Sequence, residues 1–149
     1  MKQILAVMII ALSFGVSAQI SFKTGDAGFD AELTVTNKEA KEDINAFKQS
    51  LKDTYNATTS KIDEMLKIME PAEALLSYKI ADVANQPIDN VVNSYRKNSD
   101  KGWGAIAKEM GIKPGSPEFH ALKGKAKKSK GSGNGNGGGN GKGKGKGKK

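Results

Sequence analysis

Apolar residues that recur at helical spacing, in stretches interrupted by prolines, constrain this chain more than any other feature. Between residues 36 and 122 they recur at intervals of three and four, which places their side chains on one face of an α-helix. The stripes are Ala40, Ile44, Phe47 and Leu51; Ile62, Met65, Leu66 and Met69; Ala72, Leu75, Leu76, Ile80 and Val83; Ile88, Val91, Val92 and Tyr95; and Trp103, Ile106, Ala107 and Met110. The pattern predicts an all-α domain over 36–122, a compact bundle of five or six short helices.

Capping residues and prolines indicate where these helices begin and end. Thr36-Asn37-Lys38-Glu39 fits a capping box, so we expect the first helix to begin there and to end near Tyr55. The hydroxyl of Thr58 is placed to cap the second helix. Pro71 and Pro87 are suited to open the third and fourth helices, because proline fits the first turn of a helix.

The C-terminal part of the domain carries a distinctive run of residues. Gly102-Trp103-Gly104 leads a predicted helix, Gly111 is placed as its C-cap, and Ser116-Pro117 starts a short final helix. We expect Trp103 to anchor the core, since it begins the apolar stripe of its helix. The run GWGAIAKEMGIKPGSPEFHAL, from Gly102 to Leu122, resembles the C-terminal signature of a group of small exported bacterial proteins of uncharacterised function. The resemblance covers residues 38–122; it implies a signal peptide, a helical domain and sometimes a Gly/Lys-rich end, and it carries over no catalytic residue.

The N-terminal residues follow the order of a secretory signal peptide. Lys2 gives a basic start, an apolar run extends from Ile4 to Leu12, and small residues lead to Ala18. The apolar run is about half of the roughly 20 residues that span a membrane, so residues 1–18 are predicted to be a signal peptide cleaved after Ala18. We therefore expect an exported protein, periplasmic or secreted, with no transmembrane span after signal removal. Residues 19–35 are expected to form an irregular N-terminal arm.

The positive charge of the chain is concentrated near its C-terminus. The formal net charge is +8, yet residues 19–122 hold 13 Lys and Arg against all 16 acids, whereas residues 123–149 hold ten Lys and no acid. No apolar residue after Ala126 offsets the entropy of ordering, so we expect 123–149 to be a disordered, basic, Gly/Lys-rich tail. The predicted polyanion-binding residues are Lys123, Lys125, Lys127, Lys128, Lys130, Lys142, Lys144, Lys146, Lys148 and Lys149.

No group of residues has the spacing of an active site or a metal site. His120 is the single histidine and the chain has no cysteine, so a zinc site would lack its ligands; we interpret His120 as a structural or surface residue. The adjacent carboxylates of Glu42-Asp43 and of Asp63-Glu64 point about 100° apart on a helix and do not converge on one substrate atom. We predict that the protein is not an enzyme and has no catalytic residue, metal or cofactor.

Three interpretations of function remain open. In the first, the tail tethers the protein to anionic envelope or extracellular polymers, or to a membrane surface. In the second, the helical domain is a protein- or ligand-binding module and the tail is incidental. In the third, residues 80–95 form a helix-turn-helix-like unit that binds nucleic acid. Asp89 and the net acidic charge of the domain argue against this third interpretation. We favour the first, and the sequence names no specific protein partner.

Overall fold

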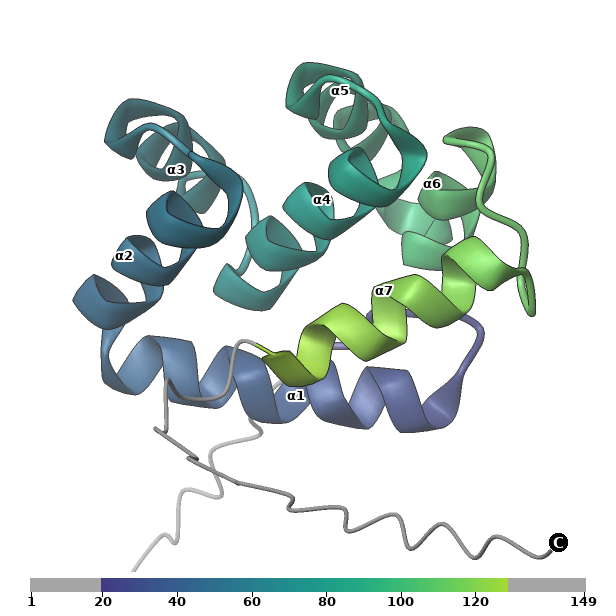
Figure 1. Cartoon of the computed structure of the whole chain (residues 1–149), viewed down its shortest axis with the longest axis horizontal. Helices are drawn as coiled ribbons and strands as arrows, with labels where there is room; N and C mark the ends of the chain where they lie inside the picture. Colours follow the sequence, from purple (N-terminus) through teal and green to yellow (C-terminus); the bar gives the residue numbers. More distant parts are fainter. Residues whose placement is uncertain (1–19, 129–149) are drawn as a thin grey trace, which may run out of the picture.

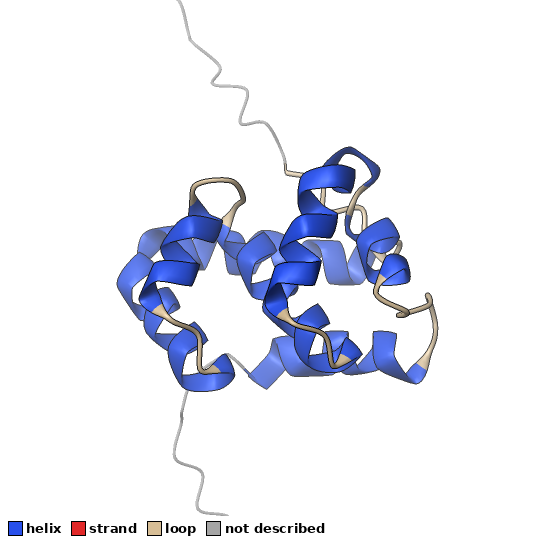
Figure 2. Cartoon of the chain, turned by 90° about the horizontal axis from the view of Figure 1, so that it is seen from above, coloured by secondary structure: helices blue, strands red, loops and turns tan. Residues whose placement is uncertain are grey.

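The computed structural model describes residues 20–128, and this part of the chain is built of helices without a strand (Figure 2). The α-helices are α1 (Ala27–Glu42), α2 (Ile44–Tyr55), α3 (Thr59–Leu66), α4 (Pro71–Ala84), α5 (Ile88–Asn98), α6 (Trp103–Glu109) and α7 (Pro117–Lys128), with a short 3-10 helix, η1 (Ser99–Lys101), before α6. The all-α prediction is confirmed, with seven α-helices in the described residues instead of five or six. None of these helices has both the length and the apolarity needed to cross a membrane.

Helix α4 is the centre of the bundle, and it contacts α1, α2, α3, α5 and α7 (Figure 1). Every residue from Ala74 to Ala81 is buried, which is typical of a helix covered on all sides. One core cluster lies between α4 and α1, α6 and α7; its members include Phe22, Phe29, Leu33, Leu76, Ile80, Trp103, Ile106 and Leu122. A second cluster lies between α4 and α2 and α3; its members include Phe47, Leu51, Ile62, Met65, Leu75 and Tyr78.

Helix α1 begins much earlier than predicted, so the expectation of an irregular arm over 19–35 was wrong from Ala27 onward. Asp26 caps the helix by accepting a hydrogen bond from the Phe29 N–H at 2.8 Å. Phe29 and Leu33 are both 1% exposed, because this stretch packs its apolar face into the core. Thr36 lies within the helix and donates its hydroxyl to the Glu32 carbonyl at 2.9 Å, so it is not a capping residue.

The single helix predicted from 36 to 55 is divided at Asp43, whose backbone is not helical (φ −138°, ψ 81°). The Asp43 carboxylate accepts a hydrogen bond from the Ala46 N–H at 2.9 Å and thereby begins α2. Ala40 and Ile44 therefore belong to different helices, although they continue one apolar stripe in the sequence. The stripe is preserved because both helices bury it in the same core cluster.

The other predicted helix boundaries are confirmed. Thr58 caps α3 by accepting a hydrogen bond from the Lys61 N–H at 3.2 Å, and Ser116 caps α7 through the Phe119 N–H at 3.2 Å. Pro71 opens α4 and Pro87 is the N-cap of α5. Gly111 follows the end of α6 in the left-handed conformation, at φ +88°.

Helix α7 continues to Lys128, so the helical domain does not end at Leu122 as predicted. The first part of the predicted tail, residues 123–128, is helical. Lys and Ala are good helix formers, and lysines near a helix C-terminus interact favourably with the helix dipole. Phe119 on α7 packs edge-on against Phe29 on α1, with ring centroids 6.3 Å apart, which holds the two helices together. The predicted signal peptide and the predicted tail from residue 129 lie outside the described residues.

The backbone of Phe22 and Lys23 crosses the start of α6 at the Gly102-Trp103-Gly104 run. The N–H groups of Trp103 and Gly104 donate to the carbonyls of Phe22 and Lys23, each at 2.9 Å. A Cβ atom on Gly102 would collide with the Lys23 Cβ, and one on Gly104 would lie 3.0 Å from the Thr24 carbonyl oxygen. Gly102 is therefore required by the close approach of the two backbones, and a side chain at Gly104 would be tightly packed against the backbone of Lys23 and Thr24.

Candidate functional site

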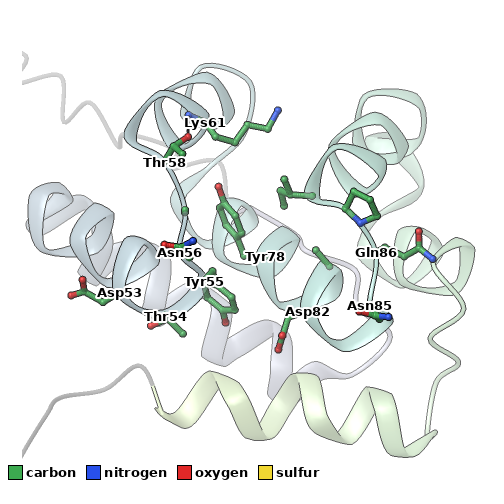
Figure 3. A pocket seen from close by; sticks show the side chains of 14 residues that line it. Asp53, Thr54, Tyr55, Asn56, Thr58, Lys61, Tyr78, Asp82, Asn85 and Gln86 are labelled. Carbon is green, nitrogen blue, oxygen red and sulfur yellow. Dashed lines mark hydrogen bonds between the residues drawn. The ribbon is translucent and has the colours of Figure 1, made fainter.

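A groove of about 910 Å³ lies between the α2–α3 turn and the α4–α5 turn (Figure 3). Its volume falls within the range of roughly 300–1,000 Å³ that is typical of ligand sites. The groove is lined mainly by polar and aromatic side chains together with a few small apolar ones. The lining residues are Asp53, Thr54, Tyr55, Asn56, Ala57, Thr58, Lys61, Tyr78, Ala81, Asp82, Asn85, Gln86, Pro87 and Ile88.

Two stacked tyrosines form the centre of this groove. The ring centroids of Tyr55 and Tyr78 are 5.5 Å apart and their planes are inclined by 21°. Tyr55 is the last residue of α2, and Asn56 follows it in the left-handed conformation (φ 52°), which turns the chain toward α3. Tyr78 lies on the buried middle of α4, so the packing of α2 against α4 brings the two rings together.

Two aspartates, Asp53 and Asp82, line the groove. Asp53 and Asp82 lie on either side of the tyrosines in Figure 3, near the C-terminal ends of α2 and α4. Burial, together with the negative charge of Asp82, raises the pKa of Tyr55 to about 12. The Asp82 carboxylate is therefore close enough to disfavour a second negative charge in the groove, and Tyr55 remains neutral at physiological pH.

Among the residues whose side chains the structure describes, Lys61 is the one basic residue that lines the groove, and two acids pair with it. Its Nζ lies 2.5 Å from an Asp89 carboxylate oxygen and 3.2 Å from one of Glu64. The hydrogen bond to Asp89 is the main reason that the pKa of Lys61 is raised above its usual value. Arg96 approaches Glu64 from the opposite side, at 3.0 Å. Lys61 therefore stays charged but adds little positive field to the groove.

The Tyr78 hydroxyl is buried and has no hydrogen-bond partner among residues 20–128. The whole residue is only 6% exposed, and burial raises the pKa of its phenol. A buried polar group without a partner costs about 1–3 kcal/mol, so such groups are uncommon in folded proteins. Tyr78 lines the groove, but its hydroxyl oxygen is itself buried.

Three of the four acidic residues in the Glu42-Asp43 and Asp63-Glu64 pairs serve structural roles. Asp43 caps α2, Asp63 pairs with Lys48 at 2.6 Å, and Glu64 pairs with Lys61 and Arg96. His120 is exposed on α7. Within the part of the chain that the structure describes, no cluster of three or more His, Cys, Asp or Glu is arranged to hold a metal ion.

Trp103 anchors the core, as predicted. It is 2% exposed, it stacks on Tyr95 with ring centroids 5.3 Å apart, and its Nε1 donates to a Glu73 carboxylate oxygen at 3.1 Å. The other Glu73 oxygen accepts hydrogen bonds from the Tyr95 hydroxyl at 3.1 Å and from the Glu70 N–H at 2.8 Å. The Glu73 carboxylate thus accepts from the N-cap of its own helix and from one residue each of α5 and α6, which joins α4, α5 and α6.

The predicted polyanion-binding lysines divide into two groups. Lys123 forms an ion pair with Asp26 at 2.7 Å, so it is part of the fold instead of a free tail. Lys125, Lys127 and Lys128 belong to the last turns of α7. The remaining six lysines, Lys130, Lys142, Lys144, Lys146, Lys148 and Lys149, lie outside the described residues.

The groove was not predicted from the sequence. Tyr55, Tyr78 and Asp82 did not stand out because they are separated along the chain and match no motif. Tyr78 lies on α4, where nearly every position is buried, and sequence periodicity does not distinguish the residues that meet α2. A useful signal was Asn56, since asparagine after a helical stripe is typical of a left-handed turn.

Comparisons with known protein families, with curated proteins and with solved structures find no match to this chain.

Proposed function

We propose that this protein is an exported, non-enzymatic attachment protein whose lysine-rich C-terminal end binds anionic polymers of the cell envelope or its surroundings. One observation carries the proposal, namely the separation of charge along the chain. Residues 123–149 hold ten Lys and no acid, whereas the rest of the chain after the predicted signal peptide holds more acids than bases. A polyanion is therefore attracted to one end of the molecule and not to its helical surface.

The physics of this attachment depends on the number of lysines more than on their order. Near an anionic surface each lysine contributes about 1 kcal/mol, and the attraction falls off within a Debye length of about 8–10 Å. Binding releases condensed counterions, so the affinity falls steeply as the salt concentration rises. The Lys123–Asp26 ion pair lies at the base of this end, beside the N-terminus of α1.

The second candidate function is a binding module in which the helical domain recognises a ligand. The groove of about 910 Å³ with its stacked tyrosines is the observation that favours this candidate. Ligand binding by the groove is compatible with attachment, because the lysine-rich end would bind the polymer and the helical domain would bind the ligand.

Charge removal at constant chain length tests the attachment proposal. We expect a variant with six Lys→Gln changes, at 130, 142, 144, 146, 148 and 149, to lose most of its affinity for heparin, duplex DNA and anionic liposomes. On duplex DNA, the slope of log K against log salt should become shallower by roughly 0.9 for each phosphate that is no longer neutralised by a lysine. The matched control removes six exposed lysines of the helical domain, at 38, 52, 67, 97, 108 and 113. An equal weakening in both variants would refute the proposal, because the binding would then follow total charge.

Export is tested separately. When the complete chain is expressed in a bacterium with two membranes, we expect mass spectrometry of the exported protein to show an N-terminus at Gln19. An intact chain that starts at Met1 and stays in the cytoplasm would contradict the export part of the proposal without affecting polymer binding.

A further inference from the structure

Two consecutive helical hairpins of the bundle are built alike (Figure 1). Helices α2 and α3 form the first and helices α4 and α5 the second, and each turns through an asparagine in the left-handed conformation, Asn56 at φ 52° and Asn85 at φ 50°. Two positions after the asparagine comes the N-cap of the next helix, which is Thr58 in the first hairpin and Pro87 in the second. A shift of 29 positions, from 56 to 85 and from 58 to 87, therefore relates the two turns.

The same shift relates buried apolar positions of the two hairpins. Each member of the following pairs is at most 8% exposed. The pairs are Phe47 and Leu76, Leu51 and Ile80, and Ile62 and Val91. Stacked helical units of one kind present equivalent groups along a shared surface. A ligand that lies across both turns therefore meets similar chemistry twice.

The groove of about 910 Å³ lies between these turns, and Figure 3 shows Asn56 and Asn85 on opposite sides of it. Both residues are exposed, and neither side chain forms a hydrogen bond within residues 20–128. Glycine adopts the left-handed conformation without strain, so each asparagine adds a carboxamide that the turn itself does not require. Each carboxamide offers two N–H donors and a carbonyl acceptor to a ligand.

Neutral polar groups make up most of the exposed lining of the groove. The exposed side chains of this kind are Thr54, Asn56, Thr58, Asn85 and Gln86. The half-buried Tyr55 adds a phenol that stays uncharged at physiological pH, because burial raises its pKa to about 12. Hydroxyl, phenol and carboxamide groups all both donate and accept hydrogen bonds, as the hydroxyl groups of a sugar do. The lining therefore suits an uncharged ligand that is rich in hydroxyl groups.

The groove offers little to an apolar anchor. Its apolar lining residues are Ala57, Ala81, Pro87 and Ile88, of which only Pro87 is exposed. A peptide gains most of its affinity from aromatic or aliphatic side chains that fill pockets, so this lining favours a sugar over a peptide. The volume lies at the upper end of the range for ligand sites, which suits a chain of several sugar rings better than a single ring.

We propose that the groove between the α2–α3 and α4–α5 turns binds a neutral oligosaccharide, and that the carboxamides of Asn56 and Asn85 hydrogen-bond different sugar units of it. The inference rests on the second candidate function, ligand binding by the helical domain, and is independent of attachment through the lysine-rich end. Because the ligand carries no charge, its affinity should change little with salt concentration, in contrast to that of a polyanion.

NMR titration of the ¹⁵N-labelled full chain with two neutral probes, cellotetraose and tetra-N-acetylchitotetraose, locates the binding surface. We expect at least one probe to shift the side-chain amide signals of Asn56 and Asn85, with the same affinity at low and high salt. Asn45 on α2 and Asn93 on α5 are exposed and lie outside the groove, so their side-chain amide signals should not move. No binding of either probe, or binding that shifts all four side chains alike or leaves Asn56 and Asn85 unshifted, would overturn the proposal.

Paired variants of the full chain separate the groove from the lysine-rich end. Asn56→Gly with Asn85→Gly removes both carboxamides and keeps the left-handed backbone, and it should weaken oligosaccharide binding about tenfold, since two neutral hydrogen bonds are lost. Asn45→Ala with Asn93→Ala removes the same groups from exposed helical positions and should leave the affinity unchanged. Equal weakening in both pairs, or none in either, would contradict the proposed contacts.

Heparin binding by the same proteins distinguishes the two proposals. We expect Asn56→Gly with Asn85→Gly to bind heparin as the unsubstituted chain does, because no lysine is changed. If the chain binds heparin but neither oligosaccharide, the groove proposal fails and attachment stands. If it binds an oligosaccharide through the two asparagines but not heparin, attachment fails and the groove proposal stands.

Discussion

Replacement of Lys79 by methionine tests how this bundle tolerates a charge at its centre. The Lys79 side chain lies on α4 and is 0% exposed, and its Nζ has no hydrogen-bond partner within residues 20–128. Burial lowers the pKa of Lys79 from 10.5 to about 8, and the negative charge of Glu32 opposes only part of this change. The protonated amine is therefore held in an environment that disfavours its charge.

The magnitude follows from the difference between the two pKa values. At 1.36 kcal/mol per unit, a change from 10.5 to about 8 corresponds to a cost of about 3 kcal/mol for keeping the amine charged in the folded protein. Methionine retains a flexible unbranched side chain and removes the charge. We expect Lys79→Met to raise the free energy of unfolding at pH 7 by about 1–3 kcal/mol, the lower value allowing for imperfect packing of the thioether.

The direction in which the stability difference changes with pH follows from the lowered pKa of Lys79. Because the pKa of Lys79 is lower in the folded than in the unfolded state, the unfolded chain binds more protons between pH 8 and 10.5. The stability contributed by this group in the native chain therefore rises with pH across that interval. The advantage of Lys79→Met should be complete below pH 8 and should shrink as the pH approaches 10.5.

Urea unfolding followed by the fluorescence of Trp103, the only tryptophan, measures the effect at pH 6, 7, 8, 9 and 10. The difference in the free energy of unfolding between the unsubstituted protein and Lys79→Met, taken at each pH, cancels the contribution of every other titrating group that behaves alike in both. Lys38→Met, at an exposed position of α1, is the matched control and should change stability little at any pH. A Lys79→Met difference that is the same at pH 6 and pH 10, or that destabilises the protein at pH 6, would refute the reasoning.

Two further predictions concern the junctions of the fold. Gly102→Ala should destabilise the protein by about 2–3 kcal/mol, because its methyl group collides with Lys23 and its φ is +86°. Gly111→Ala, at φ +88° with nothing within 4 Å, should cost only the backbone strain of about 1 kcal/mol. Thermal unfolding measures both variants, and equal destabilisation would contradict the close approach at Gly102. Glu73→Gln replaces one acceptor oxygen by an amide donor and should cost about 2 kcal/mol and shift the fluorescence of Trp103, whose Nε1 donates to that carboxylate. Unchanged emission and stability would show that the three hydrogen bonds on Glu73 contribute little.

Local interactions made much of this fold predictable. A cap or a helical stripe depends on residues no more than four apart, so Thr58, Pro71 and Ser116 mark the starts of α3, α4 and α7 from the sequence alone. The net acidic domain and the lysine-rich end are likewise properties of composition and require no folding to recognise.

Only the tertiary structure decided where α1 begins and which residues meet in the groove. Thr34, Val35 and Thr36 are weak helix formers, yet the helix extends through them because Phe29 and Leu33 on the same element are buried in the core. Tyr55 and Tyr78 stack only because α2 packs against α4, and the Trp103 N–H finds its acceptor on a helix thirty positions earlier. Such interactions join residues far apart in the chain, so their energies depend on the whole packing arrangement and leave no local pattern in the sequence.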